Sequence, residues 1–267
     1  MTTTTALPTY FIPHGGGPWP FMPDRAAQLR SLTEFLHGLL ADAGPRPRAI
    51  LVVSGHWEEA VPTVSSRLDY SMLYDYYGFP EHTYALQYPA PGSPEVAERV
   101  VGALAAAGLP AATEHERGYD HGVFVPFMLV APEATIPVVP LSLVSGLDPA
   151  QHLAIGRALS ALRREGILIV GSGMSFHNLR ALFDGTDVLA RSSRFDAWLN
   201  DAIVGDPATR DAQLTAWASA PEARFAHPRA EHLLPLMVAA GAADGESATR
   251  VYSNDIMGAA TSGFRFG

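Results

Sequence analysis

Apolar runs rich in β-branched residues alternate along the chain with longer segments of amphipathic, helical pattern. This alternation is typical of α/β proteins, in which helices cover a central sheet. The predicted strands cover residues 9–12, 49–54, 63–65, 136–142, 167–170 and 250–252. The predicted helices, several of which begin with Pro or Asp and end before Gly, cover residues 24–43, 94–107, 149–164, 188–204 and 229–240.

No internal repeat and no linker rich in Gly, Ser or charged residues divides the chain. Its 267 residues are 48 % hydrophobic and 17 % charged, which is near the average of globular proteins and predicts a sizeable core. We therefore expect a single α/β domain over residues 1–267. Its central sheet, mostly parallel or mixed, should be flanked by helices.

A histidine follows three of the predicted strands just as the chain turns. These histidines are His14, His56 and His177, and glycines beside them let the backbone turn sharply. In an open parallel sheet, ligands bind at the carboxyl ends of the strands, where residues far apart in sequence can meet. The sequence therefore predicts an active site at the carboxyl ends of the strands.

Other histidines are ambiguous on sequence alone. His121 lies just before the apolar run 123–130, so it either caps a buried helix or strand or belongs to the site. Either His227 or His232, near the start of the predicted helix 229–240, can supply a further ligand. Spacing does not decide between them.

The amino-acid composition removes several kinds of chemistry. The chain has no cysteine, and all 18 of its basic residues are arginine. It therefore has no thiolate nucleophile, iron–sulfur cluster or thiolate zinc site, and no lysine for Schiff-base chemistry. A histidine cluster in such a chain most naturally binds a transition metal through neutral imidazole.

The charge balance bears on the partners of the protein. The formal net charge is -9 and the arginines are scattered, which argues against a nucleic-acid backbone as a partner. No uninterrupted apolar run approaches the roughly 18 residues of a membrane-spanning helix. We expect a cytoplasmic protein with no nucleic-acid or membrane partner, and a homo-oligomer stays open.

Residues 70–92 have no clean helical or strand period. This segment carries aromatic residues among prolines and glycines: Tyr74, Tyr76, Tyr77, Phe79, Tyr84 and Tyr88. One interpretation is an ordered surface loop whose rings fold onto the sheet. The other is a rim that walls an apolar pocket for a ring-shaped substrate.

Short motifs occur along the chain in a fixed order. They are IPHGG at 12–16, VSGHW at 53–57, YDYYGFP at 74–80, YPAPG at 88–92, DHG at 120–122, IPVVPLS at 136–142, GSG at 171–173, HNL at 177–179 and EHLLPL at 231–236. Jointly they resemble the class III extradiol ring-cleaving dioxygenases (LigB-like), in the branch related to 4,5-DOPA extradiol dioxygenase. The first motif departs from better-known members, so we expect the pocket beside His14 to differ.

The resemblance implies a role for each histidine of these motifs. A non-haem metal would be held by His14, His56 and His232. His177 would be a further ligand in zinc-loaded forms or an acid/base group in the iron enzyme. His121 would be a second acid/base or substrate-orienting residue.

The function that the resemblance implies is Fe(II)-dependent opening of a catechol ring, DOPA-like or related, by O2. Iron is expected because the reaction needs a metal that passes electrons between bound partners, although zinc can occupy the site in purified protein. The side chains expected to contact this small aromatic diol are Tyr74, Tyr77, Phe79 and Trp57. Two alternatives stay open: a zinc-dependent hydrolase in which the same histidines activate water, and a non-catalytic metal-binding relative.

Overall fold

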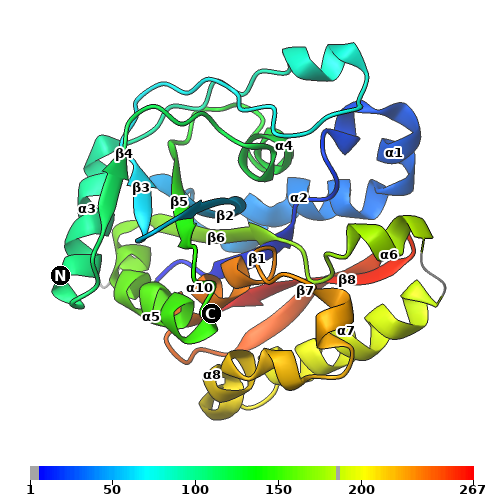
Figure 1. Cartoon of the computed structure of the whole chain (residues 1–267). Helices are drawn as coiled ribbons and strands as arrows, with labels where there is room; N and C mark the ends of the chain where they lie inside the picture. Colours follow the sequence, from blue (N-terminus) through cyan, green and yellow to red (C-terminus); the bar gives the residue numbers. More distant parts are fainter. Residues whose placement is uncertain (1–5, 185–186) are drawn as a thin grey trace.

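The computed structural model describes residues 6–184 and 187–267, and its helices cover both faces of a central sheet (Figure 1). Eight strands form this sheet in the order β4-β3-β5-β2-β6-β1-β8-β7. They are β1 Thr9–Pro13, β2 Ala49–Glu59, β3 Thr63–Ser65, β4 Ala112–Glu114, β5 Val138–Val144, β6 Ile167–Gly173, β7 Ala248–Ile256 and β8 Ala259–Phe266. The predicted single-domain α/β fold with a mixed sheet is confirmed.

The middle of the sheet is parallel, and antiparallel pairs lie toward its edges. Strands β5, β2, β6 and β1 pair in parallel, whereas β8 runs antiparallel to β1 and β3 antiparallel to β5. The central strands are apolar runs that are buried along most of their length, as expected when both faces of a sheet are covered. Because these strands are parallel, their carboxyl ends lie at one side of the sheet.

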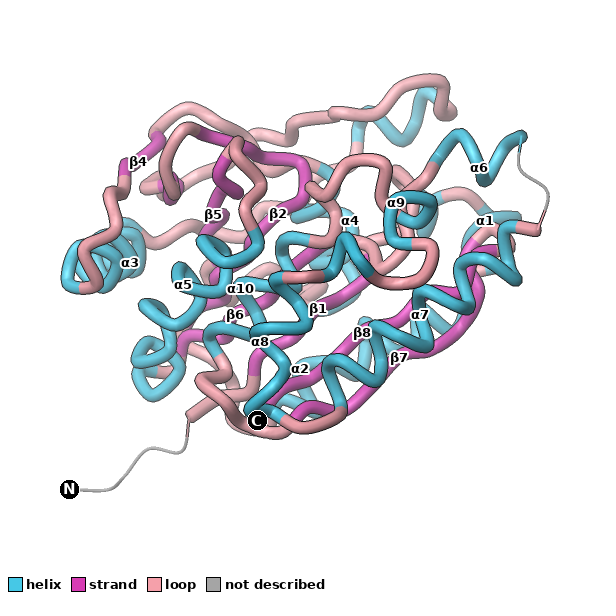
Figure 2. Tube along the Cα trace, turned by 60° about the horizontal axis from the view of Figure 1, so that its bottom comes forward, coloured by secondary structure: helices cyan, strands magenta, loops and turns pink. Residues whose placement is uncertain are grey.

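Helices lie on both sides of the strands (Figure 2). An apolar core on each face separates the sheet from its helices. Alternate residues of a strand point to opposite faces, so Val52 belongs to the core that includes residues of α2 and α4, whereas Val53 belongs to the core that includes residues of α3, α5, α7 and α10. Among the described residues, no helix combines the length and apolar character needed to cross a bilayer. The helices are α1 Pro23–Gln28, α2 Arg30–Ala43, α3 Pro94–Ala106, α4 His121–Val130, α5 Pro149–Leu159, α6 Leu179–Asp184, α7 Val188–Val204, α8 Pro207–Thr215, α9 Ala223–Ala226 and α10 Leu234–Ala242.

Some predicted boundaries are wrong. The predicted helix 24–43 is two helices, because the backbone leaves the helical region at Leu29, where no Gly or Pro marks the break. The predicted helix 229–240 begins only at Leu234, next to Pro235, whose ring favours the first turn of a helix. The pattern does not predict β8, since small residues interrupt its apolar alternation.

Candidate metal centre and active site

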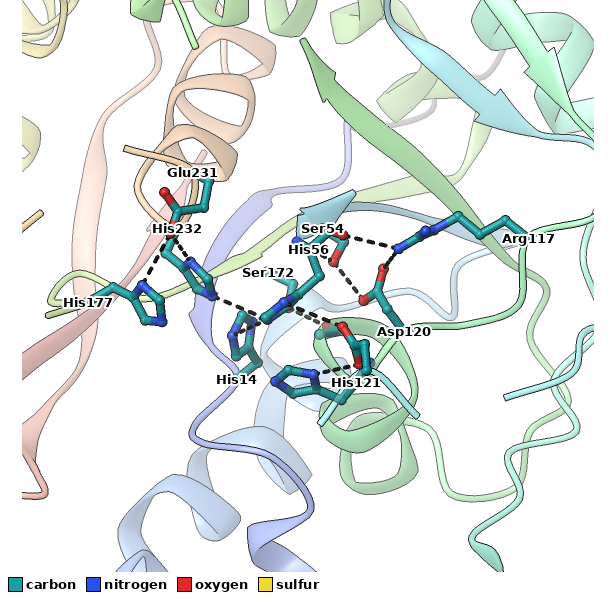
Figure 3. Close-up of polar contacts among 12 residues, drawn as sticks. His14, Ser54, His56, Arg117, Asp120, His121, Ser172, His177, Glu231 and His232 are labelled. Carbon is teal, nitrogen blue, oxygen red and sulfur yellow. Dashed lines mark hydrogen bonds and ion pairs between the residues drawn. The ribbon is translucent and has the colours of Figure 1, made fainter. Parts of the chain in front are cut away.

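Five histidines from distant parts of the chain gather at the carboxyl ends of the central strands (Figure 3). His14 follows β1, and His56 lies within β2. His121 is the first residue of α4, His177 follows β6, and His232 lies just before α10. The structure thus brings together every histidine to which the family resemblance gave a metal or acid/base role.

His14, His56 and His232 form a nearly equilateral triangle, with ring centres 4.9, 5.2 and 4.7 Å apart. The Nε2 atom of His56 lies 3.2 Å from that of His14 and 3.2 Å from that of His232. An ion about 2.1 Å from three nitrogens, at angles of roughly 90° to 110°, separates them by about 3.0 to 3.4 Å and their ring centres by about 4.5 to 5.3 Å. The two Nε2 distances from His56 and all three ring-centre separations therefore match one shared metal ion.

Each imidazole of the triangle uses its second nitrogen, Nδ1, to contact a polar partner. The partners are the hydroxyl of Ser172 at 3.1 Å from His14, a carboxylate oxygen of Asp75 at 3.4 Å from His56, and one of Glu231 at 2.9 Å from His232. Metal-binding histidines typically hold their other nitrogen in this way, which fixes the orientation of the ring. The lone pairs of the Nε2 atoms are thereby left for a shared ion.

Burial keeps the three imidazoles uncharged. Burial, followed by repulsion from neighbouring histidines, lowers the pKa of His14 and of His56 well below the usual value. Burial also lowers the pKa of His232 to about 4, although Glu231 opposes the shift. Because neutral imidazole is the form that binds metals, the triangle can accept an ion at neutral pH without first losing protons.

His177 lies flat against His232, with ring centres 3.4 Å apart and 15° between the ring planes. Its Nδ1 atom is 3.3 Å from the carboxylate of Glu231. An imidazole binds a metal in the plane of its ring, and two nearly parallel planes at this separation cannot both contain an ion about 2.1 Å from each ring. Of the two roles expected for His177, this geometry favours the acid/base group over the ligand.

His121 borders the triangle from the side of α4, with its ring centre 4.0 Å from that of His56 and 5.5 Å from that of His14. Donor atoms of these three residues all lie within 4.8 Å of one another, so they too could hold an ion. However, the 4.0 Å separation is shorter than a shared ion allows. His232 therefore completes the better-fitting donor set.

Two carboxylates each contact a pair of histidines. Asp75 faces His121 and His56, and Glu231 faces His177 and His232. Burial raises the pKa of both carboxyls, but the hydrogen bonds from histidine outweigh it and leave each pKa below its ordinary value. Both carboxylates are therefore ionised at neutral pH. Glu231, His177 and His232 also lie close enough to hold a metal, but the Nδ1 atoms of both histidines already face one Glu231 oxygen.

Nearly the whole chain matches one protein family. The family model described as the catalytic LigB subunit of aromatic ring-opening dioxygenase matches residues 10–265. The chain belongs to this family. The predicted enzyme class, an extradiol aromatic ring-opening dioxygenase, is confirmed by this match together with the relatives that follow.

Several proteins are similar in sequence to this chain over most of their length. This chain is 41 % identical to "Dioxygenase tasH" of Hapsidospora irregularis, over 94 % of its own length and 82 % of the relative. It is 38 % identical to the 4,5-DOPA dioxygenase extradiol of Beta vulgaris, over 92 % of this chain and 90 % of the relative. The crystal structure of an uncharacterized protein from Escherichia coli K12 superposes with a TM-score of 0.79 at 30 % identity, covering 98 % of this chain and 100 % of that one.

Tyr76 and Phe79 of the loop 70–92 form an aromatic wall beside His121. The ring centre of Tyr76 lies 5.8 Å from that of His121, and the ring of Phe79 lies 5.4 Å from Tyr76. The hydroxyl of Tyr74 donates to the carbonyl of Leu86 at 2.6 Å, so it is turned back onto the loop. The loop thus packs its rings internally and also presents aromatic surface to the histidines.

Two residues expected to contact the substrate lie outside this wall. Trp57 is 2 % exposed, and its indole donates to Glu59. Adjacent residues of a strand point to opposite sides, so Trp57 points away from the side on which His56 meets the other histidines. Tyr77 is 92 % exposed at a turn made by Gly78, whose φ is 76°. The sequence analysis assigned no substrate contact to Tyr76, yet its ring is the one that packs beside His121.

The backbone of His56 is fixed by a buried polar network. The Ser54 hydroxyl accepts from the His56 amide at 3.2 Å and donates to Asp120 at 2.7 Å. The Arg117 guanidinium donates to both the His56 carbonyl and Asp120 at 3.1 Å. Both carboxylate oxygens of Asp120 thus take part in holding the backbone of a histidine of the triangle.

Two residues near the centre, His227 and Gly173, have a structural role. His227 lies apart from the triangle, with its Nε2 donating to the carbonyl of Ser175 at 2.9 Å, which resolves the choice between His227 and His232. Gly173 is required for close packing, since a Cβ there would lie 2.2 Å from the carbonyl oxygen of His232. The glycine thus lets β6 approach the segment that presents His232.

Proposed function

We propose that this dioxygenase opens the ring of a small catechol with O2, using Fe(II) bound by His14, His56 and His232. The observation that carries the proposal is the 3.2 Å distance from the Nε2 atom of His56 to the Nε2 atoms of His14 and His232, with the Nδ1 atom of each of the three contacting a polar partner. Three protein ligands leave coordination positions open. Fe(II) bound there would supply a redox-active centre for the diol and O2, which redox-silent zinc cannot supply.

His177 and His121 are the proposed acid/base residues. The Nδ1 atom of each faces a carboxylate, Glu231 and Asp75 respectively. When Nδ1 carries the proton, Nε2 carries a lone pair and can accept one. We assign to His177 the removal of one proton from the diol. His121 would take the second diol proton on its Nε2 atom and later donate that proton to an oxygen atom derived from O2.

Tyr76 and Phe79 form the proposed surface on which the substrate ring lies. The Tyr76 hydroxyl donates to the carbonyl of Thr83 at 2.6 Å, and burial raises the pKa of this phenol to about 12. The wall is therefore uncharged at neutral pH and suited to an aromatic face. Contacts from Tyr74, Tyr77 and Trp57 to the substrate stay predictions.

Anaerobic reconstitution tests the proposal. Metal-free protein is loaded with Fe(II) and mixed with a broad panel of catechols in air-saturated buffer. We expect uptake of one O2 per catechol and the yellow colour of a ring-opened semialdehyde, with none from the zinc-loaded protein. Bound iron without oxygen uptake on any catechol would overturn the proposal, and hydrolytic activity with zinc alone would favour the hydrolase.

A further inference from the structure

Asp75 makes three contacts with the histidine cluster through one carboxylate. Its Oδ1 accepts from the backbone amide of His121 at 3.0 Å and from the imidazole Nδ1 of the same residue at 2.7 Å. Its Oδ2 lies 3.4 Å from Nδ1 of His56. One side chain therefore orients both a histidine of the metal triangle and a proposed acid/base histidine.

The same residue belongs to the loop 70–92, which carries the aromatic wall. Within the loop, regular structure is limited to the 3-10 helix Glu81–Ala85 and one bridge between Met72 and Tyr119. The wall residues are held mainly by side-chain bonds inside the loop, such as Tyr76 to Thr83. Besides the ring contact between Tyr76 and His121, the polar link from the loop to the histidines is Asp75, directly beside Tyr76.

We propose that Asp75 is a positioning residue that couples metal binding to the placement of the aromatic wall. The inference rests on the proposed metal site. An ion at the triangle fixes the ring of His56, which fixes Asp75 and with it the backbone of the neighbouring wall residues. Because such coupling is reciprocal, a wall held in place also favours binding of the ion.

Glu231 provides a matched control. It contacts a histidine of the triangle, His232, and a proposed acid/base histidine, His177, as Asp75 does on the other side. It also lies 3.4 Å from Arg229, and it precedes α10 rather than belonging to the loop. Loss of either carboxylate should weaken metal binding about 10- to 100-fold, the usual effect of removing a partner of a metal-bound histidine.

The test is hydrogen exchange of the full chain, metal-free and saturated with Zn(II), in wild type, Asp75→Asn and Glu231→Gln. A chelator competition measures zinc affinity in the same samples. In wild type we expect zinc to slow exchange several-fold in peptides from residues 70–92 and at the His121 amide, which donates to Asp75. Asp75→Asn should abolish this slowing at saturating zinc, whereas Glu231→Gln should retain it.

Each other outcome overturns the inference. Slowing that persists in Asp75→Asn would show that the wall is coupled to the metal by another route. A loop that exchanges equally with and without zinc in the wild type would remove the coupling, and this arm needs no variant to fold. In both cases the metal site itself stands, whereas failure of the wild type to bind zinc would remove the site and the coupling together.

Discussion

The imidazole of His177 stacks on that of His232, with ring centres 3.4 Å apart and the two Nδ1 atoms facing the same Glu231 oxygen. The stack distinguishes the metal-binding role of His232 from the acid/base role of His177, whereas the sequence leaves both roles open for His177. His232 presents its Nε2 atom to the triangle, whereas the plane of His177 passes beside it. The two neighbouring residues should therefore respond differently to mutation.

His177→Ala is expected to keep its metal and lose its activity. Zinc affinity should stay within about tenfold of wild type, because Glu231 still contacts the Nδ1 atom of His232 when His177 is removed. Turnover with Fe(II) should fall about 10²- to 10⁴-fold, as for loss of a general acid or base. His232→Ala is the control and should lose most of its zinc affinity. Equal loss of zinc in both variants would instead identify His177 as a ligand.

Tyr76→Ala should weaken substrate binding more than Tyr77→Ala. The Tyr76 ring lies 5.8 Å from His121 and packs on Phe79, whereas Tyr77 is 92 % exposed. We expect the KM for catechol to rise about tenfold or more in Tyr76→Ala, which corresponds to roughly 1.4 kcal/mol of lost ring contact. Steady-state kinetics of both variants provide the comparison. An equal or larger rise in Tyr77→Ala would place that exposed ring on the substrate.

Gly173→Ala should destabilise the fold and disturb the metal centre. The added Cβ would lie 2.2 Å from the His232 carbonyl oxygen, so the backbone must shift. We expect the free energy of unfolding to fall by about 1 to 3 kcal/mol, as in other overpacked sites, together with weaker zinc binding. Gly102→Ala in α3 meets no atom within 4 Å and should stabilise by up to about 1 kcal/mol. Urea denaturation of both variants checks the pair, and an unperturbed Gly173→Ala would contradict the packing.

His227 should make the metal-free fold sensitive to mild acid. Burial lowers its pKa from 6.5 to about 3, and its Nδ1 atom has no partner to accept a bond from an added proton. Between pH 6.5 and about pH 3, His227 binds a proton in the unfolded chain but not in the folded one. The folded state is therefore fully favoured above pH 6.5 and becomes less stable relative to the unfolded chain as the pH falls. From pH 6.5 to 5 this group should cost about 2 kcal/mol.

His227→Gln provides the comparison for this pH effect. A glutamine can still donate to the Ser175 carbonyl but does not titrate. Urea unfolding of both metal-free proteins at pH 7 and pH 5 should therefore show a smaller loss of stability in the variant. The same loss in both proteins would mean that His227 does not take part in the acid response.

The sequence predicts the architecture because the central strands are long apolar runs whose burial leaves little ambiguity. It also predicts that histidines meet, since His14, His56 and His177 each follow a predicted strand, and parallel strands end at one side of the sheet. His121 and His232 are different, because they come from helix starts. Their place in the centre was predicted from the family resemblance rather than from pattern.

The rest depends on contacts that periodicity does not encode. Asp75 is an acidic residue between tyrosines, and this isolated carboxylate was the available signal for a contact with the histidines. Glu231 directly precedes His232, but adjacency alone does not show that its carboxylate turns back to the Nδ1 atom. The break at Leu29 and the small-residue strand β8 were missed because tertiary packing, not local preference, determines both.

The most direct test of the central claim is an anomalous-scattering crystal structure of the protein loaded anaerobically with Fe(II). The account predicts one iron atom about 2.1 Å from the Nε2 atoms of His14, His56 and His232, with His177 and His121 beside it but unbound. Iron bound by a different set of residues, or distributed over two sites, would contradict the account.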